Sequence, residues 1–137
     1  MPRFLDTNIL LHYFTGNPAN QAARARRLLQ QVESSEEKVV TSVMVLFETV
    51  FTLQRTYKVQ KGDIQQMVAD VISLPGVQLA GKRLYLRALA IYAENAPLSF
   101  ADAYNAAFME DRDITEIYSW DTDLDKLGTV TRVEPAE

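Results

Sequence analysis

The stretch Arg3-Phe4-Leu5-Asp6-Thr7-Asn8-Ile9-Leu10 sets the pattern of this chain, because a short apolar segment ends directly at an aspartate and helix-like sequence follows. Residues 3–5 are predicted to form a strand. The helical pattern resumes over residues 9–14 and stops at Gly16-Asn17-Pro18. The aspartate is therefore expected at the carboxyl end of a strand, which is where open α/β sheets place their functional residues.

The rest of the chain alternates in the same way. Further strands are predicted at residues 38–41, 77–79, 116–120 and 130–133, and helices at residues 19–32, 43–57, 63–73, 82–94 and 99–110. Ser42 is the expected cap of the helix that follows it. Strands that alternate with helices of about ten to fifteen residues predict βαβ units and a parallel sheet. We therefore expect one α/β domain over residues 1–137, with about five short strands.

The amino-acid composition excludes several classes of protein and of metal site. The 137 residues fit a single domain, and a hydrophobic fraction of 47% predicts a substantial core. The chain has no cysteine and one histidine, His12, which excludes disulfides and Cys/His zinc sites, so any metal ligands must be oxygens. No apolar run approaches the ~20 residues of a membrane helix, and the N-terminus lacks a signal-peptide pattern. These features predict a soluble, cytoplasmic protein.

The net charge of −4 neither supports nor excludes an RNA partner. Phosphate contacts favour a basic surface, but a site built from four carboxylates could by itself account for the net negative charge of the chain. Bound divalent cations would reverse the charge locally.

Two aspartates follow predicted strands directly. Asp6 ends the first strand, and Asp121 follows Ile117-Tyr118-Ser119-Trp120 in the same manner. If those strands are neighbours, the two carboxylates meet above one edge of the sheet. Each aspartate also suits the simpler role of a helix cap, and the two interpretations are evenly balanced for either residue alone.

Two further acids lie on predicted helices. Glu48 lies within the most apolar helix of the chain, where burying an unpaired carboxylate would cost several kcal/mol. The alternative is that it turns to solvent on the narrow polar side of that helix. Asp102 follows Ser99 at the spacing of a capping box, although that motif usually carries Glu or Gln. From the first helical turn, Asp102 would also face the cleft beyond the strand ends.

Taken together, four acids from distant parts of the chain are more specific than any one of them. Clustered carboxylates raise one another's pKa unless a cation compensates their charge. Ligation by oxygens alone favours Mg²⁺ or Mn²⁺ over zinc, and such sites typically act on phosphates.

Four segments carry a family resemblance. Phe4-Leu5-Asp6-Thr7-Asn8-Ile9-Leu10 resembles the opening signature of PIN-domain nucleases. The later acidic motifs of that family resemble, in order, Val45-Leu46-Phe47-Glu48, Phe100-Ala101-Asp102-Ala103 and Ser119-Trp120-Asp121-Thr122-Asp123. Ser-Trp replaces the usual Thr-Phe before Asp121 but keeps a hydroxyl and an aromatic ring. The resemblance spans essentially the whole chain, whose length is similar to that of VapC-type toxins of toxin–antitoxin pairs.

This resemblance implies a three-layer α/β/α fold and a homodimer. It also implies a Mg²⁺-dependent endoribonuclease, with Mn²⁺ able to substitute, that acts on RNA and is paired with a cognate antitoxin. The implied metal ligands, direct or through water, are Asp6, Glu48, Asp102 and Asp121, with Asp123 at a neighbouring acidic position. The implied supporting residues are Thr7, Asn8 and the hydroxyl-bearing Ser119. Asn105 would be either a hydrogen-bond donor behind the ligands or a polar surface residue.

Other interpretations stay open. A catalytically silent PIN-like module would bind RNA or protein, but such modules lose acids and none is missing here. An acidic-site phosphatase would begin with an Asp-x-Asp motif, whereas this chain has Asn8 at the second acidic position. The RNA contacts are not predicted. Arg24 and Arg27 share a helix face, as Arg83 and Arg87 do, yet such pairs are usually solvated surface.

Overall fold

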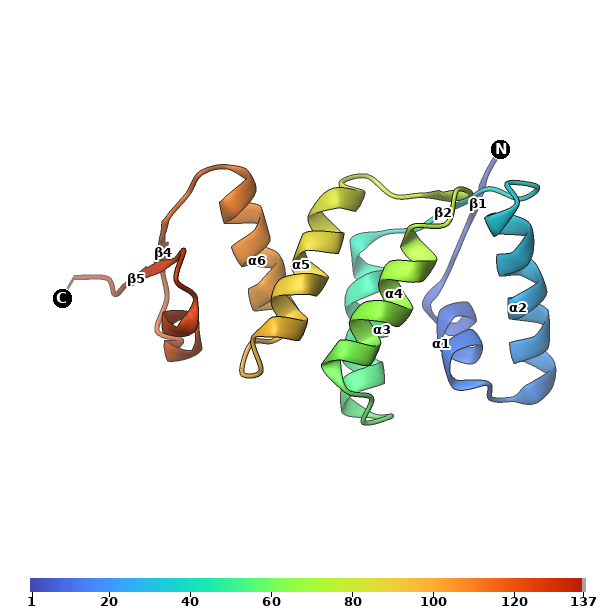
Figure 1. Cartoon of the computed structure of the whole chain (residues 1–137), viewed down its shortest axis with the longest axis horizontal. Coiled ribbons are helices and arrows are strands. Elements are labelled where there is room, and N and C mark those ends of the chain that lie inside the picture. Colours follow the sequence, from blue (N-terminus) through green and yellow to red (C-terminus); the bar gives the residue numbers. More distant parts are fainter. Residues whose placement is uncertain (137) are drawn as a thin grey trace. The chain divides into compact units, whose positions relative to one another are not determined.

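The computed structural model describes residues 1–136 and divides the chain into two compact units, Met1–Lys82 and Arg83–Glu137. Figure 1 gives the order of the helices and strands along the chain. Each unit has its own parallel sheet. That the two units form one domain stays a prediction.

The N-terminal unit contains three short parallel strands. They are β1 (Arg3–Phe4), β2 (Val39–Val40) and β3 (Val77–Gln78), in the spatial order β1-β2-β3. Arg3 aligns with Val39, and Val39 aligns with Val77. The helices of this unit are α1 (Thr7–Thr15), α2 (Ala19–Glu33), α3 (Val43–Arg55) and α4 (Lys61–Ile72). Parallel pairing follows because each strand is joined to the next by helices.

Local sequence accounts for the ends of these helices. The Asp6 side chain accepts a hydrogen bond from the Thr7 amide at 2.8 Å and caps α1. Gly16 ends α1 in the left-handed conformation, at φ 71°, where glycine has no steric penalty. Ser42 caps α3 as predicted, by accepting from the Val45 amide at 3.4 Å.

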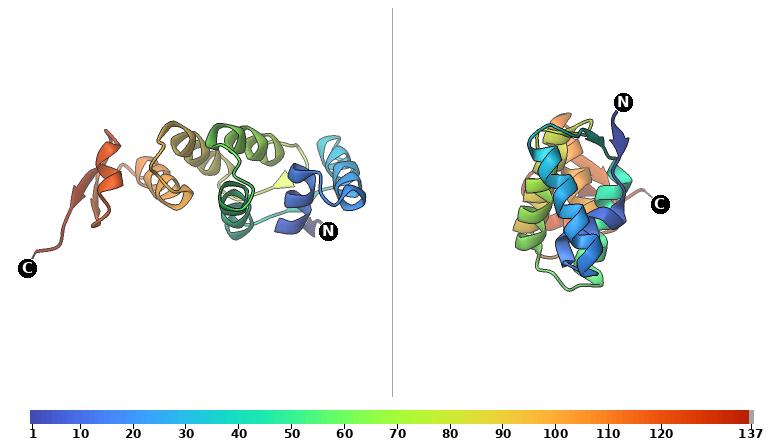
Figure 2. Two further views of the ribbon diagram at one scale, coloured as in Figure 1. Left: turned by 90° about the horizontal axis from the view of Figure 1, so that it is seen from below. Right: turned by 90° about the vertical axis from the view of Figure 1, so that its right-hand side faces the viewer.

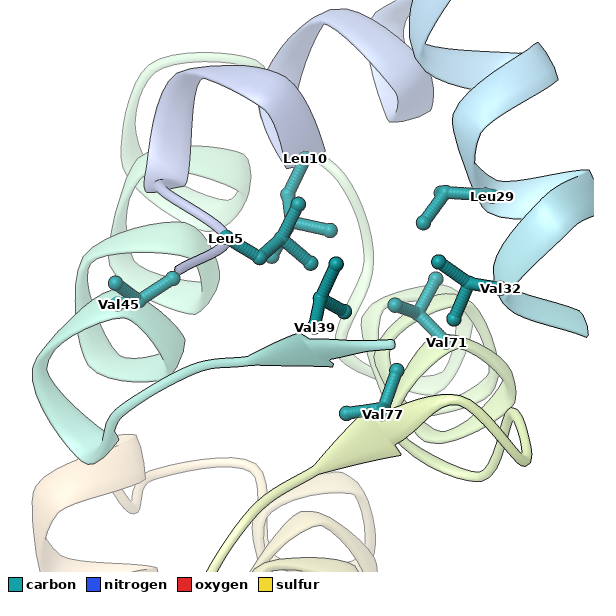
Figure 3. Close-up of a cluster of buried hydrophobic side chains, with 8 residues drawn as sticks. All are labelled: Leu5, Leu10, Leu29, Val32, Val39, Val45, Val71 and Val77. Carbon is teal, nitrogen blue, oxygen red and sulfur yellow. The ribbon is translucent and has the colours of Figure 1, made fainter. Parts of the chain in front are cut away.

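An apolar cluster joins the sheet of this unit to its helices (Figure 3). Leu5 follows β1, Val39 and Val77 come from β2 and β3, and Leu10 and Val32 come from α1 and α2. All five side chains are at most 3% exposed. Because Leu5 and Leu10 lie on either side of Asp6 in sequence, the same burial that stabilises the core holds that aspartate at the start of α1.

The C-terminal unit continues from α5 (Lys82–Glu94) through α6 (Phe100–Asp111) to β4 (Glu116–Tyr118), the short 3₁₀ helix η1 (Thr122–Lys126) and β5 (Thr131–Val133). Strands β4 and β5 pair in parallel, and Figure 2 shows η1 beside them. The Tyr92 and Phe100 rings meet edge to face at 5.7 Å, and the Tyr85 and Tyr104 rings stack at 5.3 Å. These ring contacts hold the start of α6 against α5.

The predicted α/β class is confirmed, with six α-helices and five short parallel strands among the described residues. The predicted helix boundaries agree to within about two residues. The strands are shorter than predicted, and they pair as one sheet of three and one of two. Among residues 1–136, no helix has the length and apolar character needed to cross a membrane.

Candidate metal centre

Asp6 lies where the sequence places it, between β1 and α1, with its side chain exposed. Its Oδ1 atom accepts from the Thr7 amide. The two roles considered for this residue are compatible, because capping occupies one carboxylate oxygen and leaves the other for a ligand. Thr7 is 5% exposed, so the amide that holds Asp6 belongs to a residue packed into the unit.

Glu48 is exposed on α3, although the same helix buries Val45, Leu46, Thr49 and Val50. The argument that Glu48 is a costly buried carboxylate is therefore wrong, since the broad apolar face of α3 turns this residue towards solvent. Its assignment as a ligand then rests on the motif alone. An exposed carboxylate is nevertheless accessible to a cation or a water molecule.

In the C-terminal unit, Asp121 and Asp123 lie near enough to Asp102 to affect its pKa. Burial raises the pKa of the Asp102 carboxyl, and the nearby carboxylate of Asp121 raises it further through charge repulsion. Asp123 adds a smaller repulsion, and a hydrogen bond with Ser99 acts in the opposite direction. A group of carboxylates that repel one another is the electrostatic condition that a divalent cation relieves.

Backbone amides hold these acids in place. The Asp102 amide donates to Ser99 Oγ at 3.1 Å, so Ser99 caps α6 as predicted. Asp121 caps η1 by accepting from the Asp123 amide at 2.9 Å, while its own amide donates to Ser119 Oγ at 3.0 Å. Ser119 therefore positions the backbone of Asp121 through this hydrogen bond. Its role in supporting a metal ligand stays a prediction.

Sequence reasoning missed Arg132. This guanidinium donates to the Ser119 carbonyl at 3.2 Å and pairs with Asp125 at 3.0 Å, so it ties β5 to both ends of the segment that carries Asp121. No spacing rule could have found it, because its partners lie 7 and 13 positions away and meet it only through the pairing of β4 with β5.

The donor set fits a hard divalent cation. The acids supply carboxylate oxygens, which suit Mg²⁺ or Mn²⁺. Across the described residues 1–136, no group of three or more histidine or acidic side chains lies in an arrangement that could hold a metal ion.

A scan against family models matches residues 3–130 to the PIN domain. This chain belongs to the PIN-domain family. The match begins at the first strand and includes Asp6, Glu48, Asp102 and Asp121, the four acids that the geometry above describes. The predicted resemblance is thereby confirmed at the level of the family.

One curated relative supports a VapC-type member of the family. A VapC ribonuclease of Aquifex aeolicus (strain VF5) is 24% identical to this PIN domain over 135 residues. The alignment covers 98% of each chain. The alignment therefore extends over nearly the whole of both chains.

The remaining predicted residues of this PIN domain are exposed. Asn8 lies in the first turn of α1, and Asn105 lies on α6 one turn after Asp102. Arg87 pairs with Glu110 at 2.8 Å, which makes it a structural contact of the C-terminal unit. Arg24, in contrast, lines a cleft between α1 and α2 together with Asn8 and His12.

Proposed function

We propose that this PIN domain is a metal-dependent endoribonuclease that hydrolyses RNA phosphodiester bonds, and that it is the toxin of a toxin–antitoxin pair. The observation that carries the catalytic part is the repulsion between the nearby carboxylates of Asp102 and Asp121, which a cation would relieve. Family membership and the VapC ribonuclease relative support the same conclusion.

Asp6, Glu48, Asp102 and Asp121 would together hold the cation, with Asp123 beside them. A bound Mg²⁺ or Mn²⁺ would supply a nucleophilic water of lowered pKa and neutralise charge on the scissile phosphate. The chain itself fixes the ligands. The Thr7 amide orients Asp6, and the Asp123 amide orients Asp121, so that one oxygen of each carboxylate stays available. Glu48, exposed on α3, completes the ligand set or orients the attacking water.

The partners follow from the same proposal. The substrate would be RNA, and cleavage would leave a 3′-hydroxyl and a 5′-phosphate. A cognate antitoxin would inhibit the enzyme, and two copies would form a homodimer. The whole-length match to a VapC ribonuclease supports the toxin assignment, and a small open reading frame directly beside this one would add to it.

Cleavage of a mixed RNA pool by the purified protein tests the proposal. We expect discrete products with Mn²⁺, none with EDTA, and none with Asp121→Asn. Asp63→Asn serves as the matched control, because Asp63 is an exposed acid on α4 outside the site and its variant should cleave normally. Equal cleavage by the wild-type protein and Asp121→Asn would contradict the assignment. A folded protein that cleaves nothing would favour the silent binding module.

A further inference from the structure

A cleft of about 420 Å³ opens between α1 and α2 of the N-terminal unit. Its lining residues come from one face of each helix: Asn8, Ile9 and His12 from α1, and Gln21, Arg24, Ala25 and Leu28 from α2. The cleft starts two residues after Asp6 and continues for one helical turn, which is about 6 Å along α1. Its first lining residue, Asn8, lies in the first turn of the helix that Asp6 caps.

Arg24 gives this cleft a positive charge. Arg3, Arg87 and Arg132 are each paired with acids. Arg24 is exposed on α2, and within the part of the chain that the structure describes no acidic side chain lies at ion-pair distance from it. An unpaired guanidinium in a cleft of a protein with net charge −4 is available to an anionic ligand.

The other lining groups suit a nucleotide. The Nδ1 atom of His12 hydrogen-bonds the Asn17 carbonyl at 2.8 Å, and since a carbonyl only accepts, Nδ1 carries the proton. Within residues 1–136, the other ring nitrogen, Nε2, makes no hydrogen bond. Asn8 and Gln21 add amide donors and acceptors, while Ile9 and Leu28 offer apolar surface. Single-stranded RNA is recognised by this mixture of base-edge hydrogen bonds, stacking on side chains and phosphate contacts.

A second cleft of the same unit lacks that character. It has a volume of about 470 Å³ and lies among α1, α2 and α4, with Arg26, Asp70 and mostly apolar or aromatic side chains in its lining. The carboxylate of Asp70 would oppose the charge of a phosphate there. Of these two clefts, the one that contains Arg24 has an unopposed cation and begins nearer to Asp6 along α1.

We propose that the cleft between α1 and α2 binds one nucleotide of the single-stranded RNA substrate beside the scissile phosphate, with Arg24 on its phosphate. Asn8, His12 and Gln21 contact the base or ribose, so they contribute to sequence preference. The inference rests on the proposed function, because it assigns a subsite of the same reaction. It also separates Arg24 from Arg27, which shares its helix but lines none of the clefts described above.

RNA binding by cleavage-deficient protein tests this. In the Asp121→Asn background with Mg²⁺, the affinity for a fluorescein-labelled single-stranded oligonucleotide is measured at several salt concentrations. Arg24→Gln should weaken binding about tenfold or more and make the salt dependence shallower by about 0.7, the value for one phosphate contact on a single strand. Arg24→Lys should keep most of the salt dependence, because it keeps the charge. Arg27→Gln is the matched control and should change affinity less than about twofold.

Several results would overturn the subsite. If Arg24→Gln and Arg27→Gln lose RNA affinity equally, the attraction is a general effect of surface charge and not a property of the cleft. If the parent Asp121→Asn protein does not bind the oligonucleotide, single-stranded RNA is not the ligand of the cleft. Displacement of the RNA by hexaglutamate at equal concentration would indicate a site for an acidic peptide. The cleavage assay separates this test from the proposed function. If the wild-type protein cleaves RNA in a metal-dependent way, but Arg24→Gln has the same RNA affinity and the same KM as Arg27→Gln, the subsite is refuted and the nuclease function stands.

Discussion

The carboxyl group of Asp102 in the first turn of α6 lies near the carboxyl group of Asp121, which caps η1, and the charge of Asp121 raises the pKa of Asp102. Two nearby carboxylates repel each other when both are charged, and a bound cation would relieve that repulsion. The relationship links secondary structure to chemistry, because the starts of α6 and η1 carry two of the four proposed ligands.

The first prediction concerns the stability of the metal-free protein. Because burial and Asp121 raise the pKa of Asp102, the folded protein binds more protons than the unfolded chain between the usual and the raised pKa. The contribution of Asp102 to stability therefore falls as the pH rises through that window. Asp102→Asn should raise the urea midpoint at pH 7 in EDTA, and this advantage should shrink as the pH is lowered towards the ordinary carboxyl value of 3.8.

Urea unfolding of wild type and variant at matched pH values measures this difference. Asp63→Asn controls for the loss of one negative charge, because Asp63 is exposed and lies in the first turn of α4. A variant that is less stable than wild type at pH 7 in EDTA would show that repulsion between Asp102 and Asp121 does not govern the site.

The second prediction is that Mn²⁺ stabilises the wild-type protein. A cation that binds only the folded state at about one hundred times its Kd adds about 2.7 kcal/mol to the free energy of unfolding. The thermal midpoint should rise accordingly in wild type and in Asp63→Asn. It should stay nearly unchanged in Asp102→Asn and Asp121→Asn, because each variant loses a charged ligand. Thermal melts with Mn²⁺ or EDTA provide the measurement.

The helices of this protein could be predicted closely because their signals are local. Ser42 and Ser99 were expected to cap helices from their own neighbourhoods, and both do. The helical pattern predicts the start of α1 two residues late, because it does not decide whether Asp6 is a cap or a ligand, and in the structure Asp6 caps this helix. The start of α4 at Lys61 was also missed, because Gly62 has a low helix propensity.

The parts that could not be predicted depend on contacts between distant segments. The exposure of Glu48 is decided by which face of α3 packs against the core, and the apolar sequence around it covers almost every face. Arg24 and Arg27 look alike in sequence, and only the packing of α1 on α2 makes one of them line a cleft. Arg132 meets Ser119 through strand pairing, which single-sequence patterns do not encode.

The third prediction separates the two roles of Asp6. Asparagine caps helices about as well as aspartate, so Asp6→Asn should leave the free energy of unfolding almost unchanged. It removes a charged metal ligand, so cleavage should fall at least about a hundredfold, which corresponds to about 2.7 kcal/mol of transition-state stabilisation. Asp6→Ala should lose activity and also about 1 kcal/mol of stability, because the cap to Thr7 is lost.

Cleavage rates and urea unfolding of both variants test this separation. An Asp6→Asn protein that cleaves RNA at the wild-type rate would limit Asp6 to its role as a helix cap. Equal destabilisation by Asn and Ala would indicate instead that the charge of Asp6, rather than its hydrogen bond, stabilises α1.

The fourth prediction concerns Gly76, which immediately precedes β3 and holds the turn that aligns it. A Cβ atom added there would lie 2.5 Å from the Glu37 carbonyl oxygen and 2.6 Å from that of Val32. The Gly76 amide also donates to the Val32 carbonyl at 3.0 Å, so the backbone has little room to withdraw. Gly76→Ala should therefore lower the free energy of unfolding by about 1–3 kcal/mol, as overpacking does elsewhere.

Gly62→Ala is the matched control for this substitution. Nothing lies within 4 Å of a Cβ at Gly62, which is the second residue of α4, so alanine should raise stability by about 0.5–1 kcal/mol through its higher helix propensity. Opposite shifts in the urea midpoints of the two variants would support the close approach at Gly76. A stabilising Gly76→Ala would mean that the contact between the end of α2 and the start of β3 is looser than the geometry indicates.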